Sequence, residues 1–126
     1  MVLSTGTLSV LSWNARGCSK AAAAQLLRDL EQDAGCFDVI CLQETAEWGS
    51  HVPIGDFICF SSAKEVGTKS VSLAIRSTYA ARILGDSFFC KARTIKIDIE
   101  VPTLGLVSLV SAHLEASPCR KNFLQN

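Results

Sequence analysis

A strand, a helix and a second strand follow one another near the amino terminus, and this order constrains the fold more than any other feature of the sequence. The apolar segment 8–13 predicts a strand, and the next segment predicts a helix with Ser19 as its N-cap and Gly35 just beyond its end. The continuous apolar run Val39–Leu42 is typical of a strand that is covered on both faces. Such a βαβ unit has parallel strands, so both strands end at the same edge of a sheet.

The rest of the chain predicts strands with no helix between them. The candidate segments, of which the third is the weakest, are 56–62, 69–77, 81–89, 94–101 and 106–113. The fourth alternates cleanly, which places Ile95, Ile97, Ile99 and Val101 on its buried face. A turn at 102–105 joins the last two segments into a hairpin. Ser117 and Pro118 then begin a helix, and the sequence ends at Asn126 inside it.

Length and composition indicate one domain, residues 1–126, that is built around a core. The chain is 48% hydrophobic and only 19% charged, and its formal net charge is zero, so no basic excess indicates strong nonspecific binding to DNA. We expect no membrane contact, because no apolar run could span a bilayer and no leader peptide is evident. The six cysteines form no C-x-x-C pair, and Cys41 and Cys59 lie in strand patterns as small buried residues. These features favour an intracellular, reducing compartment, cytoplasmic or nuclear.

Three polar residues follow apolar strands: Asn14, Glu44 and His113. Taken singly, they are typical of a turn residue, a solvated carboxylate and a hydrogen-bonded structural histidine. Together they suit the cleavage of a phosphate ester, because a carboxylate anchors Mg²⁺, an amide orients it, and an imidazole contacts phosphate or supplies a proton. Strand periodicity places only Asn14 and Glu44 at a shared edge.

Three segments carry a resemblance to a known family. LSVLSWNARG (8–17), FDVICLQET (37–45) and LVSLVSAHL (106–114) resemble, in order and separation, the first half of the endonuclease/exonuclease/phosphatase superfamily, which has the DNase I-like fold. WNARG in particular is similar to the endonuclease domains of non-LTR retrotransposons. The resemblance covers nearly the whole chain and is least diagnostic over 48–70.

The resemblance implies a role for each of the three polar residues. Glu44 would bind the metal, Mg²⁺ or alternatively Mn²⁺, with Asn14 beside it as its partner. His113 would occupy a position that contacts phosphate or acts as an acid. Arg16 matches a motif residue that contacts phosphate or forms a surface salt bridge. Gln43 also matches the motif, and we assign it no catalytic role.

The resemblance also implies the fold class, which is α/β (α+β). We expect the N-terminal half of a four-layer α/β/β/α sandwich, with a mixed sheet covered by a helix on one face. The G-D-x-N motif and the late Asp-His pair of the second half are absent, and neither His51 nor Asp56, a strand-start residue, replaces them. Because each half of the fold contributes mainly one sheet, we expect the inward face of this sheet to be uncovered. The missing C-terminal half, or a second copy of the chain, would cover it.

The expected function is a divalent-metal-dependent phosphodiester hydrolase, an endonuclease that acts on DNA and is inactive as this truncated piece. One alternative is a phosphatase or phosphodiesterase branch of the same superfamily. Another is a non-catalytic half-domain that binds a partner through its uncovered sheet face. A third is an unrelated, partner-binding α/β module, in which the three polar residues are scattered.

Overall fold

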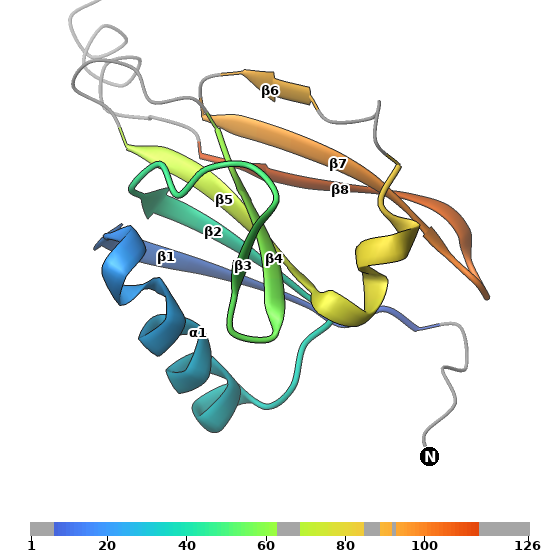
Figure 1. Ribbon diagram of the computed structural model, residues 1–126, viewed down its shortest axis with the longest axis horizontal. Helices are drawn as coiled ribbons and strands as arrows, with labels where there is room; N and C mark the ends of the chain where they lie inside the picture. The colour runs from blue at the N-terminus through green and yellow to red at the C-terminus, as the bar shows by residue number, and fades with distance from the viewer. Residues whose placement is uncertain (1–6, 63–68, 85–88, 92, 114–126) are drawn as a thin grey trace, which may run out of the picture.

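Two sheets and one long helix make up the described part of the chain. The computed structural model describes residues 7–62, 69–84, 89–91 and 93–113 (Figure 1). Its elements are β1 (Val10–Cys18), α1 (Lys20–Ala34), β2 (Val39–Thr45), β3 (Val52–Ile54), β4 (Phe57–Ser61), β5 (Ser70–Arg76), the 3-10 helix η1 (Ser77–Arg82), β6 (Phe89–Lys91), β7 (Thr94–Val101) and β8 (Gly105–Ala112). One sheet has the strand order β1-β2-β5-β4-β3, and the other has the order β6-β7-β8.

The predicted βαβ unit is confirmed. β1 and β2 are parallel, with Val10 opposite Val39, whereas the other neighbours in the sheet are antiparallel, so the sheet is mixed. The Ser19 side chain accepts a hydrogen bond from the Ala22 amide at 3.2 Å, which satisfies one of the amides that a helix start leaves open. Gly35 follows α1 with a φ of +97°, in the region that favours glycine.

The helix α1 covers one face of the five-stranded sheet (Figure 1). Its buried residues Ala23, Leu27 and Leu30 belong to a cluster that includes Ile40 and Leu42 of β2. The alternate residues of β2 face the other way, so this strand is buried on both faces, as its apolar run predicts. Within the described residues, no helix is both long enough and apolar enough to cross a bilayer.

The opposite face of this sheet is covered too, so the expectation of an uncovered inward face is wrong. β7 turns its alternating apolar residues inward, and they join the side chains of β2, β4 and β5 in one core. This core contains Val39, Cys41, Phe60, Val71, Leu73, Ile75, Ile95, Ile97, Ile99, Val101 and Leu109. The β7–β8 hairpin therefore folds over the sheet instead of extending it, and the chain supplies parts of both sheets of the sandwich.

The structure differs from the sequence-based expectation in smaller ways. The weak strand expected over 81–89 is replaced by η1 and a single bridge between Ile83 and Ile99, with 85–88 outside the described residues. The short strand β3 was not expected, and Asp56 lies in the turn between β3 and β4, immediately before β4. The helix expected from Ser117 lies outside the described residues.

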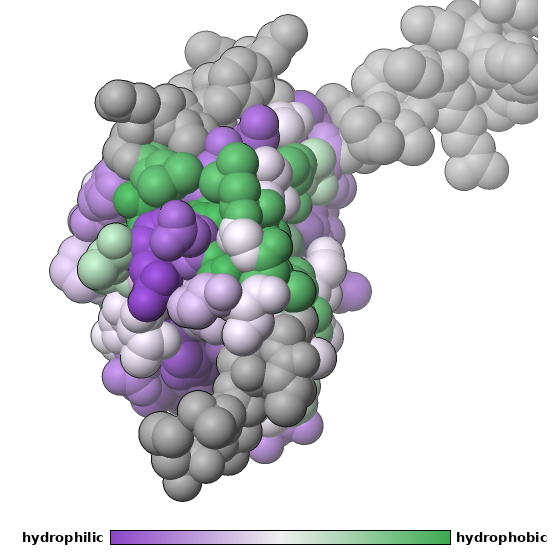
Figure 2. Space-filling model, turned by 90° about the vertical axis from the view of Figure 1, so that its right-hand side faces the viewer, coloured by the Kyte–Doolittle hydropathy of each residue, from purple (hydrophilic) through white to green (hydrophobic). Residues whose placement is uncertain are grey.

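Some large hydrophobic side chains remain exposed at the end of the molecule that carries η1 and the β7–β8 turn. They include Leu84, which follows η1, and Leu104 and Leu106 around the turn. Figure 2 faces this end and shows hydrophobic surface there among polar side chains. The sheet face that was expected to mediate self-association is buried instead.

The cysteines give a direct test of this packing. Among the described residues, Cys18, Cys36, Cys41 and Cys59 are free thiols. Burial raises the pKa of Cys41 to about 11 and that of Cys59 to about 12, whereas Cys36 is exposed. Because the thiolate is the reactive species, we expect iodoacetamide to label Cys36 rapidly and Cys41 and Cys59 only after unfolding in urea. Peptide mass spectrometry measures this, with Cys36→Ser as control, and labelling of Cys59 at the rate of Cys36 would contradict the packing.

Candidate active site

The regular pairing of β1 with β2 breaks down where both strands approach their carboxyl ends. Asn14 lies opposite Gln43, but the next pair is Cys18 with Thr45, so three residues of β1 face the single residue Glu44. The pairing of β2 with β5 also shifts at this level. Bulges of this kind re-aim side chains and are common beside active sites.

The bulge forces unusual backbone angles on the residues around it. Arg16 has a φ of +53° and Glu44 a φ of +56°, in the left-handed region that costs a non-glycine residue free energy. Gly17, with a φ of +91°, adopts the same region without that cost. Backbone strain of this kind persists only where the surrounding structure holds it, and it gathers at functional sites.

The three polar residues singled out in the sequence lie together at this bulge. Asn14 Nδ2 donates a hydrogen bond to Glu44 Oε2 at 2.7 Å, and Asn14 Oδ1 accepts one from the Arg16 amide at 2.8 Å. His113 Nε2 lies 3.8 Å from the same Glu44 oxygen. The His113 amide donates to the Arg93 carbonyl at 2.9 Å, which fixes the chain just after β8. The amide, the carboxylate and the imidazole thus come from β1, β2 and the end of β8.

The surroundings of Glu44 favour its ionised form. The pKa of Glu44 lies below its ordinary value, chiefly because Asn14 donates a hydrogen bond to the carboxylate. The charges of His113, Lys69 and Arg16 lower this pKa further, while desolvation acts in the opposite direction. Glu44 is therefore a carboxylate at neutral pH, as a ligand for a cation must be.

The site is open to solvent. The side chains of Glu44 and His113 are each 33% exposed. A cavity of about 460 Å³ lies beside Asn14, and its described lining comes from residues Trp13 to Arg16 of β1. The carboxylate is thus partly accessible to solvent, and Asn14, its hydrogen-bond partner, lines the cavity.

The donor set fits a hard cation that keeps much of its water. Among the described residues, no three His, Cys, Asp or Glu side chains converge on a point, so a closed zinc-type site is not built here. Both contacts of Glu44 fall on Oε2, and within that same part of the chain Oε1 accepts no hydrogen bond. Mg²⁺ and Mn²⁺ suit such a site, because Mg²⁺ binds through one or two carboxylates, water and substrate phosphates. Asn14 Oδ1 keeps a second lone pair for a cation or a bound water.

Among the described contacts, the other residues considered in the sequence form no hydrogen bond or ion pair with the Glu44 side chain. Gln43 Nε2 donates to Ser12 Oγ on β1 at 3.3 Å, a contact between neighbouring strands. The His51 ring stacks edge-on against Phe60, with ring centroids 4.5 Å apart, and does not join the Glu44 group. Asp56 lies in the β3–β4 turn.

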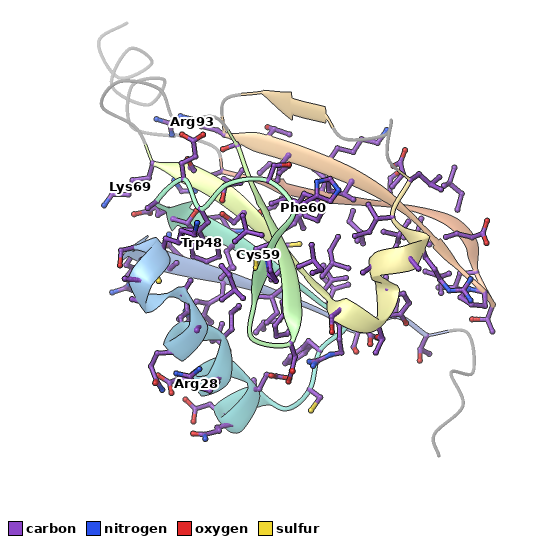
Figure 3. The ribbon with its side chains drawn as sticks, in the orientation of Figure 1. Arg28, Trp48, Cys59, Phe60, Lys69 and Arg93 are labelled. Atoms are coloured by element: carbon purple, nitrogen blue, oxygen red, sulfur yellow. The ribbon has the colours of Figure 1, made fainter. Side chains whose placement is uncertain are left out.

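The sequence did not reveal Lys69, which precedes β5 and whose charge acts on Glu44. Figure 3 shows its side chain at the same end of the sheets as Trp48 and Arg93. A lone lysine beside a strand gives no periodic signal, so only the pairing of β2 with β5 brings it here.

Fold and site together define a two-sheet α/β sandwich with a carboxylate, an amide and an imidazole gathered at one end of its strands. Among solved structures, the endonuclease domain of TRAS1, a telomere-specific non-LTR retrotransposon, has the same fold. The TM-score is 0.57 at 17% sequence identity, over 94% of this chain and 51% of the endonuclease domain. The predicted resemblance is thereby confirmed at the level of the fold.

Two further results limit the extent of this similarity. The chain spans about half the length of the endonuclease domain that it matches. No protein-family model matches the sequence, and no curated protein matches it.

Proposed function

We propose that this chain carries part of the active site of a divalent-metal-dependent phosphodiester hydrolase, an endonuclease that acts on DNA. The observation that carries the proposal is the contact of Asn14 and His113 with one ionised carboxylate, Glu44, at an open bulge. The fold shared with a retrotransposon endonuclease domain supports the choice of substrate class.

Each residue has a distinct role in this proposal. Glu44 would hold Mg²⁺ or Mn²⁺ through Oε1, and the ion would stabilise charge that develops on the phosphoryl group. Asn14 keeps the carboxylate ionised and aimed, because it bonds Oε2 while the Arg16 amide fixes its own orientation. His113 lies close enough to the same oxygen to hydrogen-bond a phosphate oxygen there, or to supply a proton.

The proposed site is incomplete in this chain. The chain spans about half of the matched domain, and its sequence lacks the G-D-x-N motif that the family resemblance assigns to the activation of the nucleophile. We therefore expect the 126-residue chain alone to cleave no DNA above background.

Plasmid nicking tests the proposal. A longer product of the same reading frame that contains this chain is expected to nick supercoiled plasmid in Mg²⁺, with EDTA abolishing the reaction. Glu44→Ala should reduce nicking by at least about 10²-fold, because its carboxylate anchors the ion. Glu100→Gln is the matched control, since Glu100 is an exposed carboxylate on β7. Unchanged nicking by Glu44→Ala would refute the role of Glu44, and release of phosphate from monoesters without nicking would move the substrate class to a phosphatase.

A further inference from the structure

The side chain of Lys69 crosses the end of β2 to reach β1. Lys69 directly precedes Ser70, which pairs with Thr45 of β2, and Thr45 in turn pairs with Cys18 of β1. Two strand spacings, about 10 Å, therefore separate the backbone of Lys69 from that of β1. Its ammonium nevertheless lies against Gly17, where a Cβ atom would come within 2.9 Å of Nζ. Glycine at this position leaves room for the ammonium.

The ammonium of Lys69 has no acidic partner among the described residues, and neither has the guanidinium of Arg16. Both side chains are exposed, and no carboxylate forms an ion pair with either of them in this part of the chain. Glu44, the carboxylate whose ionisation they favour, is already bonded to Asn14. Two cations thus flank the single negative charge of Glu44, and among the described contacts neither forms a direct ion pair with it.

The start of α1 adds to this positive surface. The helix begins at Lys20, directly after β1, and its first turn carries no acidic residue to offset the positive end of the helix dipole. Lys69 and Arg16 together carry one positive charge more than Glu44 offsets, although the whole chain has a formal net charge of zero. A surface of this kind, beside an open cavity, attracts anions.

We propose that Lys69, seated over Gly17, binds a backbone phosphate of a DNA strand next to the phosphate handled at Glu44. The inference rests on the proposed function and extends it, because it adds a second contact point along the strand. A lysine suits this task as a point charge that needs no fixed orientation of the phosphate. The contact does not read sequence, so it contributes affinity that falls as salt rises.

The salt dependence of DNA binding by the full chain tests this role. Binding of a fluorescent 20-base-pair duplex is measured by anisotropy over a range of salt concentrations for the parent and for Lys69→Gln. We expect the slope of log K against log salt to become shallower by about 1, because one phosphate contact is lost. Lys69→Arg should restore most of the slope. Lys96→Gln is the matched control, since Lys96 lies on β7 near Asp98, 3.9 Å away.

Each outcome of this experiment either supports or overturns the role of Lys69. Equal slopes for the parent and Lys69→Gln, an equal change in Lys96→Gln, or no binding by the parent at low salt would overturn the proposal. Competition by inorganic phosphate as effective as competition by unlabelled duplex would also overturn it, since the site would then hold a free anion. If the longer product fails to nick plasmid while the Lys69-dependent slope persists, only the hydrolase proposal is refuted. If the longer product nicks plasmid and the slope does not depend on Lys69, only the present proposal is refuted. Thermal unfolding of both glutamine variants confirms that they remain folded.

Discussion

Trp48→Ala is expected to lower the free energy of unfolding by about 3–5 kcal/mol, the range for removing a large aromatic side chain from a core. Trp48 is only 1% exposed and packs in the cluster between α1 and the five-stranded sheet. Its indole N–H donates to the Cys18 carbonyl at 3.2 Å, and its backbone amide donates to Ser61 Oγ at 2.9 Å. Small domains are stable by about 5–15 kcal/mol, so this single change would leave a marginal protein.

Two further variants separate packing from hydrogen bonding at Trp48. Trp48→Phe keeps an aromatic ring but loses the bond to the Cys18 carbonyl, which still accepts from the Ala46 amide at 2.9 Å. Its direct hydrogen-bond cost should therefore be no more than about 0.5–1.5 kcal/mol. Trp13→Ala is the matched control, because Trp13 is 47% exposed and its removal should cost well under half as much as that of Trp48. Urea unfolding followed by circular dichroism measures all three, and equal losses for Trp13→Ala and Trp48→Ala would contradict this packing.

The importance of Trp48 was not evident from the sequence, whereas that of β2 was. Four consecutive apolar residues, Val39–Leu42, indicate that the strand is buried on both faces, whichever elements cover it. Trp48 lies in a segment without periodicity, before a three-residue strand that contains Pro53. Nothing local marks such a residue as central, because its burial depends on the position of α1 and of the bulge in β1.

The alternation of β7 shows a related limit. It predicts correctly which residues are buried, since Ile95, Ile97 and Ile99 are fully buried. Alternation does not say what lies opposite the buried face, and a hairpin of this pattern could equally have extended the first sheet. The turn into a second layer depends on η1 and the chain around it, for which the sequence predicts a weak strand instead.

The candidate site, too, could be predicted from the sequence only in part. The meeting of Asn14 and Glu44 could be expected from physics, because parallel neighbouring strands end at one edge. The position of His113 was implied only by the family resemblance, since periodicity does not place β8 over β2. The bulge that turns Glu44 towards Asn14 leaves no local signal, as neither Arg16 nor Glu44 is a residue type that prefers a positive φ.

Glu44→Gln is expected to abolish Mn²⁺ binding at this site, because the variant keeps the shape of the side chain and removes its charge. Mn²⁺ serves as the probe, since its paramagnetism allows bound ion to be measured by water proton relaxation. Asn14→Ala should weaken binding by about 10–100-fold, the usual effect of removing a residue that orients a metal ligand. Glu100→Gln, which removes an equivalent exposed charge from β7, should leave the affinity unchanged. Equal binding by Glu44→Gln and the parent would exclude Glu44 as the ligand.

The pH dependence of this binding identifies which group is the ligand. The pKa of Glu44 is depressed, chiefly by the hydrogen bond from Asn14, so the carboxylate stays ionised until the pH falls below the ordinary range for glutamate. Mn²⁺ affinity should therefore be constant through neutral pH and decline only as the pH falls through that depressed value, and Asn14→Ala should move the decline to higher pH. A histidine ligand would instead lose the ion near its ordinary pKa of about 6.5. If Mn²⁺ affinity in the parent declined around pH 6.5, and this decline were absent in His113→Gln, the ligand would be His113 and not Glu44. That result would remove the basis for the proposed hydrolase site.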